Sequence, residues 1–176
     1  MMNKPESNFN FKAMSFMFKL RDLVMRPKDL LKEGEIKPGF RVLDYGCGPG
    51  GYLLPLVELV GNSGKIYALD IHPSAIHSVQ NIMAKNKLTN VDTILSDCKT
   101  GLPDNSIDVV LLYDTFHDLN NPDQILRELH RILKQEGILS FSDHHLKEDE
   151  IISQVTKQGL FKLSQKGKRT YSFKKL

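Results

Sequence analysis

The sequence has no tryptophan and only two cysteines among 176 residues. Cys47 and Cys98 are too few for a disulfide framework, and their spacing is not that of a C-x-x-C metal pair. No apolar run is long enough to span a bilayer, and the N-terminus shows no apolar segment followed by a small-residue cleavage site. With 40% hydrophobic and 26% charged residues, the chain is expected to be a single, cytoplasmic globular unit.

The net charge of +3 is unevenly distributed along the chain. Residues 1–32 carry seven Lys/Arg against three acids, and residues 157–176 carry seven Lys/Arg and no acid. The middle of the chain is therefore acidic. Basic ends suggest nucleic-acid binding, whereas an acidic body argues against it if the active site lies there.

Short apolar runs alternate with helix-like segments from residue 41 onward, which predicts βα units and a parallel sheet. Period-2 alternation within residues 160–175, broken by Lys-Gly-Lys, predicts a closing antiparallel hairpin. The expected fold is α/β, a Rossmann-like seven-stranded mixed sheet with helices on both faces. The five parallel strands are predicted at 41–45, 65–70, 91–96, 106–114 and 137–143.

Proline and glycine positions suggest where the helices begin and end. Pro73 suits a first helical position, and Asn121-Pro122 reads as a cap followed by a helix that continues to Gly137. The segment before the first strand reads as helical. Residues 1–34 are therefore predicted to form a helical lid on a domain of residues 35–176, rich in apolar side chains that could roof a pocket. These side chains are Phe9, Phe11, Met14, Phe16, Met17 and Phe18.

The stretch RVLDYGCGPGGY places several glycines directly after the first strand. Gly46, Gly48 and Gly51 fit the dinucleotide-binding spacing G-x-G-x-x-G, which would indicate a nicotinamide or flavin enzyme. Gly50 adds a second register, G-x-G-x-G, and Asp44 lies two residues before the first glycine. These two features suggest a different ligand, although Asp44 could instead simply cap the loop.

Other acidic residues end the following strands, and such ends meet at one crevice of an open parallel sheet. Asp70 follows the loop by about 20 residues, the place at which a carboxylate accepts hydrogen bonds from ribose hydroxyls. Ile71 beside it could cover an adenine face, and Asp97 could accept from an exocyclic amine. The alternatives are that Asp70 caps the next helix and that Cys98 is a small packed residue.

Four motifs in order, VLDYGCGPG, ALDIHP, SDC before LPDNSIDVV, and LKQEGILSF, resemble those of class I S-adenosylmethionine-dependent methyltransferases. The similarity is closest to the ubiquinone/menaquinone C-methyltransferase-like group of small-molecule enzymes and covers roughly residues 36–145. It implies a methyltransferase of the EC 2.1.1 class that uses S-adenosyl-L-methionine and releases S-adenosyl-L-homocysteine. It also implies the closing antiparallel hairpin.

The resemblance implies a role for each strand end. The Asp44 carboxyl and the glycine loop would hold the amino-acid moiety of the cofactor, Asp70 the ribose, and Asp97 with Cys98 the adenine. The full predicted cofactor-binding set is Asp44, Gly46, Cys47, Gly48, Gly50, Asp70, Ile71, Asp97, Cys98 and Tyr113.

Methyl transfer from a sulfonium is an in-line displacement, so a base is needed only when the acceptor must lose a proton. His117, after the fourth strand, is the predicted base, although it could also be structural, and Asp114 could orient the cofactor amine or the acceptor. Asp143, His144 and His145 form a His/carboxylate cluster. No metal is predicted, because adjacent histidines in an extended segment point in opposite directions.

A small, hydrophobic or aromatic acceptor is the predicted substrate, and the basic N-terminal segment would allow transient membrane contact. The sequence YDTFHDL lacks the Asn/Asp-Pro-Pro-aromatic motif of nucleic-acid amine methylation. Three alternatives stay open: a non-catalytic partner subunit, an RNA-directed enzyme that uses the basic hairpin, and a nicotinamide-dependent reductase. The hairpin lysines could equally protect a solvated sheet edge. No pattern in the sequence assigns an acceptor atom or an oligomeric state.

Overall fold

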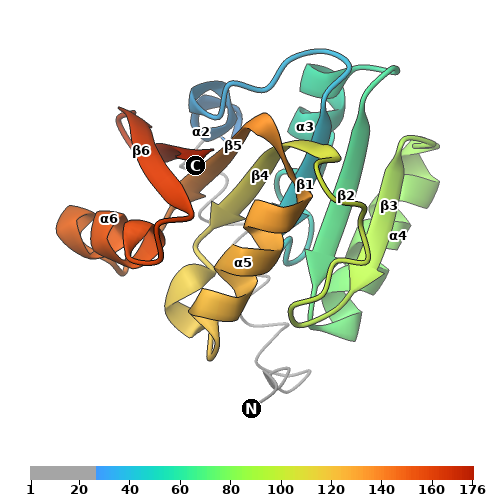
Figure 1. Cartoon of the computed structure of the whole chain (residues 1–176). Helices are drawn as coiled ribbons and strands as arrows, with labels where there is room; N and C mark the ends of the chain where they lie inside the picture. Colours follow the sequence, from blue (N-terminus) through green and yellow to red (C-terminus); the bar gives the residue numbers. More distant parts are fainter. Residues whose placement is uncertain (1–26) are drawn as a thin grey trace.

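The computed structural model describes residues 27–176 and contains a seven-stranded sheet of order β3-β2-β1-β4-β5-β7-β6 (Figure 1). The first five strands pair in parallel, whereas β7 runs antiparallel to both β5 and β6. This topology confirms the predicted mixed sheet and its closing hairpin. The strands are β1 (Arg41–Tyr45), β2 (Lys65–Asp70), β3 (Val91–Leu95), β4 (Ile107–Tyr113), β5 (Leu133–Ser142), β6 (Phe161–Lys166) and β7 (Tyr171–Lys175).

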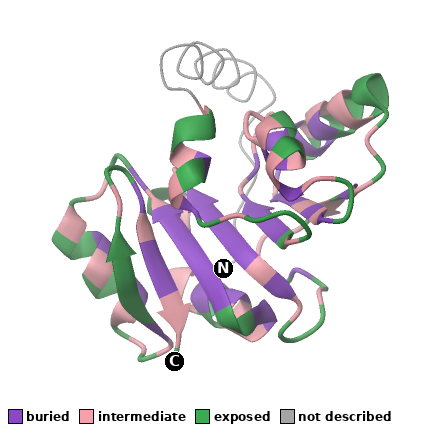
Figure 2. Cartoon of the chain, turned by 90° about the horizontal axis from the view of Figure 1, so that it is seen from above, coloured by how far each residue is buried: buried purple, intermediate pink, exposed green. Residues whose placement is uncertain are grey.

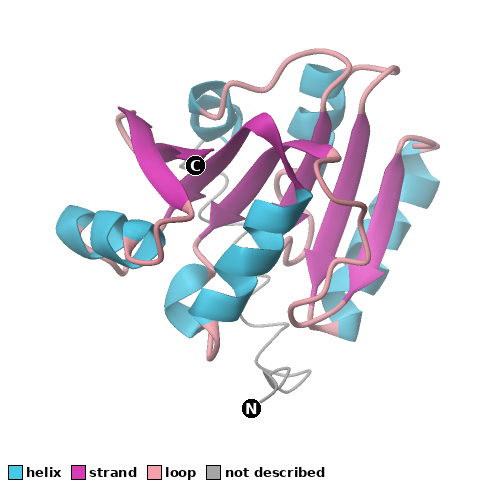
Figure 3. Ribbon diagram, viewed as in Figure 1, coloured by secondary structure: helices cyan, strands magenta, loops and turns pink. Residues whose placement is uncertain are grey.

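Helices cover both faces of the sheet, as predicted (Figures 1 and 3). One face is covered by α2 (Pro27–Glu33), α3 (Leu53–Val60) and α4 (Pro73–Asn86), and the other by α5 (Pro122–Ile132) and α6 (Glu148–Thr156). A short 3-10 helix, η1 (Phe116–Asp118), follows β4. None of the helices within residues 27–176 is long and apolar enough to cross a membrane.

The core has two halves, one on each side of the sheet, and β4 contributes to both. Val110 and Leu112 pack toward α5 and α6, whereas Val109 and Leu111 pack toward α2, α3 and α4. All four side chains are fully buried, and the buried centre of the sheet is visible in Figure 2. This double burial explains the unbroken apolar run from which a central strand was predicted.

The boundary between α5 and β5 differs from the prediction. The helix ends at Ile132 rather than continuing to Gly137, and Leu133 already has the extended backbone of a strand (φ −66°, ψ 136°). Leu133 pairs with Ile107 at the start of β4, and both side chains are fully buried. Helical periodicity continued past Ile132 in the sequence, but pairing with a strand distant in sequence determines the conformation there.

The helix α2 is fastened to the hairpin between β6 and β7. Leu31 is fully buried, and the Glu33 carboxylate accepts hydrogen bonds from the backbone amide of Arg169 and from the amide and hydroxyl of Thr170. Pro27 begins this helix. The remainder of the predicted lid, residues 1–26, lies outside the described residues. The expectation that a lid covers the pocket therefore stays a prediction.

We expect Thr170→Val to lower the free energy of unfolding by about 1.5–3 kcal/mol, the usual contribution of a hydrogen bond to a charged group. The Thr170 residue is only 1% exposed, and its hydroxyl lies 2.9 Å from Glu33 Oε2. Urea denaturation would measure the change. Thr170→Ser keeps the hydroxyl and is the matched control, so equal midpoints for Val and wild type would contradict the expectation.

Candidate functional site

The glycine loop begins where β1 ends and is held against the end of β2. The amides of Gly46 and Cys47 donate to the carbonyl of Leu69 at 2.8 and 2.9 Å. Gly46 has φ +77°, and a Cβ at this position would lie 2.3 Å from the hydroxyl oxygen of Thr115. Only glycine therefore fits at position 46, because a side chain would require both a strained backbone and a displaced Thr115.

Asp70, at the end of β2, holds the same loop through its side chain. One carboxylate oxygen accepts from the amide of Gly48 at 2.9 Å, and the other accepts from the amide of His72 at 2.8 Å. Burial raises the pKa of Asp70, and the hydrogen bonds from these amides offset only part of that rise. The N-cap of α4 is His72, whose Nδ1 accepts from the amide of Ser74, so Asp70 is not the helix cap. Each Asp70 oxygen keeps a second lone pair for a ligand.

Asp44 is a buried acid in the middle of this arrangement. The residue is 3% exposed, and burial, followed by the charge of Asp70, raises its pKa from 3.8 to about 7. No hydrogen bond from residues 27–176 compensates for this desolvation. Two carboxyl groups close together in a low dielectric oppose each other's ionisation, so a cation bound here would stabilise both. The site therefore fits the ammonium group of an amino acid.

The loop after β3 carries Asp97 and Cys98, both half-buried. The hydroxyl of Tyr45 donates to the carbonyl of Asp97 at 3.0 Å, which ties this loop to the end of β1. Burial raises the pKa of the Cys98 thiol, which is therefore neutral at physiological pH. Ile71, also half-buried, lies at the end of β2, so the predicted ribose and adenine residues occur on neighbouring strand ends.

Two other predicted cofactor residues have their side chains in the core. Cys47 is 5% exposed and packs with α3 and α4, and burial raises its pKa well above the ordinary value. The hydroxyl of Tyr113 lies 2.7 Å from that of Ser140, and its ring contacts the edge of Tyr52. Tyr113 is the last residue of β4, and Cys47 lies in the loop directly after β1. Gly48 and Gly50 have positive φ and complete the turn of the glycine loop.

His117 lies on η1 and is paired with Asp143, at the end of β5. Its Nδ1 is 2.9 Å from Asp143 Oδ2, and its amide donates to the same oxygen at 3.1 Å. The side chain of Asp143 is fully buried, whereas that of His117 is 23% exposed, with Nε2 3.4 Å from Asp118. The sequence placed these residues at neighbouring strand ends, and the structure brings them together. A buried carboxylate on Nδ1 fixes the tautomer and orientation of the imidazole.

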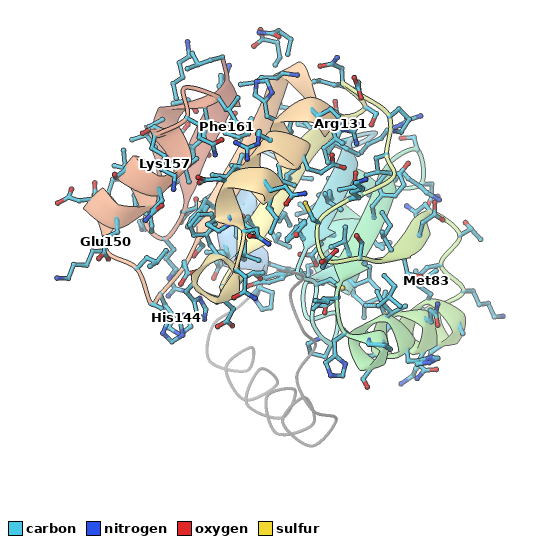
Figure 4. All side chains as sticks on the ribbon, turned by 60° about the horizontal axis from the view of Figure 1, so that its bottom comes forward. Met83, Arg131, His144, Glu150, Lys157 and Phe161 are labelled. Atoms are coloured by element: carbon cyan, nitrogen blue, oxygen red, sulfur yellow. The ribbon has the colours of Figure 1, made fainter. Side chains whose placement is uncertain are left out.

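Asp114 is paired with His144 rather than with His117. Its carboxylate accepts from the amide of His144 at 3.2 Å and lies 2.7 Å from His144 Nδ1. Asp114 has φ +49°, the left-handed conformation that a non-glycine residue rarely adopts. His144 projects at the edge of the molecule, where it is labelled in Figure 4. Backbone strain of this kind often marks a functional site.

The expectation that adjacent histidines point in opposite directions is wrong. The rings of His144 and His145 lie 3.9 Å apart between centroids, and those of His117 and His145 lie 4.1 Å apart. The reason is that residues 144–146 form a turn and not an extended segment. Even so, within the described part of the chain, no three His, Cys, Asp or Glu side chains are grouped so that they could hold a metal ion.

Sequence reasoning missed Thr115 and Tyr45 as parts of the site. Thr115 packs on Gly46 and donates to the carbonyl of Tyr113, and Tyr45 connects β1 with the loop after β3. Both follow or end a strand that was correctly predicted, and that position was the only signal available. Their partners lie far away in the sequence, which is why no local pattern identifies them.

Comparison with known proteins identifies the class to which this fold and site belong, the class I S-adenosylmethionine-dependent methyltransferases. The chain belongs to the methyltransferase domain family, whose model matches residues 36–175. The relatives that the chain matches include demethylmenaquinone methyltransferases, in line with the quinone C-methyltransferase-like group that the four sequence motifs resemble. The glycine loop had two interpretations, a nicotinamide-dependent reductase and a methyltransferase. Membership of this family favours the methyltransferase.

Individual relatives are distant. Demethylmenaquinone methyltransferase of Geobacillus stearothermophilus is 27% identical over 130 residues, which are 73% of this chain and 56% of the relative. Aklanonic acid methyltransferase DauC of Streptomyces sp. (strain C5) is 38% identical over 74 residues, 42% of this chain and 34% of the relative. The chain thus matches about half, or less, of the length of these relatives. The solved structure of a SAM-dependent methyltransferase from Aquifex aeolicus superposes with a TM-score of 0.74 at 29% identity, covering 84% of this chain and 87% of that one.

We expect Asp44→Asn to stabilise the protein at alkaline pH. Because the pKa of Asp44 is raised from 3.8 to about 7 on folding, the protonated acid is favoured in the folded state. The destabilisation is absent below 3.8, grows between the two values and is complete above about 7, where it reaches about 4 kcal/mol. The asparagine variant should therefore be more stable than wild type by about 2–4 kcal/mol near pH 8, with the difference falling toward zero near pH 4.

Urea denaturation of both proteins across this pH range measures the effect. Asp29→Asn makes the same substitution at an exposed acid on α2 and serves as the control. If the variant were less stable than wild type by the same amount at every pH, folding would not raise the pKa of Asp44.

Proposed function

We propose that the protein transfers the methyl group of S-adenosyl-L-methionine to a small, hydrophobic or aromatic acceptor by in-line displacement. The observation that carries this proposal is Asp44, a buried acid beside Asp70 with no compensating hydrogen bond from residues 27–176. Such a carboxyl group is costly in a folded protein unless a cation occupies the site. The family to which the chain belongs supports the same ligand, whose amino-acid end carries an ammonium group.

The cofactor, when bound, supplies an electrophilic methyl group on a sulfonium. In this proposal Asp44 and the amides of the glycine loop at Gly46, Gly48 and Gly50 hold the amino-acid moiety. Their positive φ values turn the backbone so that it can approach a ligand closely. Cys47 contributes through its backbone, because its thiol is packed in the core.

Asp70 would accept from the ribose hydroxyls with the lone pairs that Gly48 and His72 leave unused. Ile71 would cover one face of the adenine. Asp97 and Cys98 would bound its edge, with the Asp97 carboxylate accepting from the exocyclic amine. The location of these residues on the successive ends of β2 and β3 supports this order along one extended ligand.

His117 is proposed as the general base that removes a proton from the acceptor. Its Nδ1 is held by the fully buried carboxylate of Asp143, which leaves Nε2 as the nitrogen that exchanges protons. The carboxylate also stabilises the imidazolium that forms after proton transfer. The exposed Asp118, 3.4 Å from Nε2, would then offer a path for the proton to solvent.

Asp114 is proposed to orient the acceptor together with His144, because their contact joins the loops after β4 and β5 beside His117. The acceptor would lie between these loops and the predicted N-terminal lid. The Geobacillus and Streptomyces relatives are named for demethylmenaquinone and aklanonic acid. Both names support a small-molecule acceptor for this chain rather than a nucleic acid.

The first experiment is calorimetric titration of the protein with S-adenosylmethionine, S-adenosylhomocysteine and NADH. We expect both sulfur ligands to bind and NADH not to bind. Asp70→Asn should weaken S-adenosylhomocysteine by about 10- to 100-fold, the weight of charged hydrogen bonds to the ribose. Asp92→Asn, the same substitution at an exposed position of β3 opposite Tyr67, is the control. Preferential binding of NADH, or an Asp70 variant with unchanged affinity, would refute the cofactor assignment.

For the base, we expect His117→Gln to lower kcat by about 10²- to 10⁴-fold with little change in KM, since proton transfer and not acceptor binding is lost. The assay is transfer of labelled methyl from S-adenosylmethionine to a panel of phenols, quinols and amines. Asp143→Asn should reduce kcat as well, because the amide no longer stabilises an imidazolium. His77→Gln alters an exposed histidine on α4 and is the control, with kcat expected to be unchanged. Full turnover by His117→Gln would remove His117 from the mechanism.

A further inference from the structure

Tyr45 connects the two ends of the candidate cofactor site. It lies between Asp44 and the first glycine of the loop, at the last position of β1. Its residue is 3% exposed, and its ring packs in the core half that includes α5. From there its hydroxyl reaches the carbonyl of Asp97, 52 residues further along the chain, at 3.0 Å.

The loop after β3 is attached to the body at a second point as well. The amide and hydroxyl of Thr100 donate to Glu128 on α5 at 2.8 and 2.6 Å, and Arg131 lies 2.8 Å from the same carboxylate oxygen. The Tyr45 and Glu128 attachments therefore lie on either side of Cys98 and Lys99. Because the Asp97 carbonyl belongs to the peptide plane that follows Asp97, the Tyr45 hydroxyl constrains the backbone from which the Asp97 carboxylate projects.

The hydroxyl of Tyr45 is not needed to fill the core. Phenylalanine would retain the buried ring and its packing, and would remove only the hydrogen bond to Asp97. Burial raises the pKa of Tyr45, so the group is a neutral O–H donor at any working pH. A tyrosine at this position thus adds one directional contact, and that contact ends on a predicted adenine-binding residue.

We propose that Tyr45 is a positioning residue that gives the site its selectivity for adenine. By holding the carbonyl of Asp97, it keeps the carboxylate of this residue where it accepts a hydrogen bond from the exocyclic amine of the purine. Tyr45 itself does not touch the cofactor. The inference rests on the proposed function, because it concerns the same S-adenosylmethionine site.

The test compares two ligands that differ only in the base. S-inosyl-L-homocysteine carries a carbonyl oxygen where S-adenosyl-L-homocysteine carries the amine. Calorimetry on the full chain should show that wild type prefers the adenosyl ligand. Tyr45→Phe should weaken the adenosyl ligand by about 3- to 10-fold, the loss equivalent to one neutral hydrogen bond, and leave the inosyl ligand within about twofold. The preference for adenine should therefore narrow.

Two controls separate positioning from a general loss of structure. Tyr67→Phe makes the same substitution at a half-buried tyrosine of β2 in the same core half, and should leave the ratio of the two affinities unchanged. In an Asp97→Ala background, Tyr45→Phe should cause no further narrowing, because the two residues then act on one interaction. Urea denaturation of each variant confirms that it is folded.

An unchanged preference in Tyr45→Phe would overturn the inference while leaving the proposed function intact. Equal weakening of both ligands would also overturn it, because Tyr45 would then support the loop without discriminating between the bases. Failure of wild type to bind S-adenosylhomocysteine at all would refute the proposed function, and the inference with it.

Discussion

The hydrogen bonds that the Asp70 carboxylate accepts from the amides of Gly48 and His72 hold the glycine loop and the start of α4 together at the end of β2. Two further hydrogen bonds, from the amides of Gly46 and Cys47 to the Leu69 carbonyl, hold the start of the loop against the same strand. Burial raises the pKa of Asp44, which lacks donors of its own among residues 27–176, and the Asp70 charge raises it further. The carboxylate that shapes the loop thus also adds to the cost of ionising Asp44, and a bound cation would offset the charges of both groups.

The sequence was sufficient for the strands and for placing the candidate cofactor residues at or near the strand ends, whereas the roles of these residues stay predictions. Five apolar runs and a hairpin signal specified the sheet, because β4 is buried on both faces and the hairpin has the pattern of an edge. It failed where contacts between distant segments determine the conformation. Leu133 leaves the helix to pair with Ile107, and the turn after β5 brings the rings of His144 and His145 together. Neither of these two features could be predicted from the local sequence pattern.

The ends of β4 and β5 are joined by two crossed His–Asp pairs. Asp143 of the second loop holds His117 of the first, and Asp114 of the first holds His144 of the second. The residue types were visible in the sequence, which placed His117 and Asp114 at the same end of the sheet without predicting either pairing. The actual pairing depends on the register of β4 against β5, in which Tyr113 lies opposite Ser142. The crossed arrangement keeps both loops beside the proposed base and holds Asp114 in its left-handed backbone conformation.

The basic hairpin illustrates how linear charge can mislead. The sequence after residue 156 contains no acid, which suggested a surface for RNA. In the fold, Lys166 pairs with Glu148 on α6, and Lys174 pairs with Glu136 on β5. The neutralising acids come from the preceding segments, since β7 is inserted between β5 and β6. Lysines on an exposed edge strand also discourage pairing with other chains. The hairpin surface therefore carries less excess positive charge to attract a polyanion than the sequence of the hairpin alone suggests. Protection of the sheet edge is the better physical explanation for these lysines.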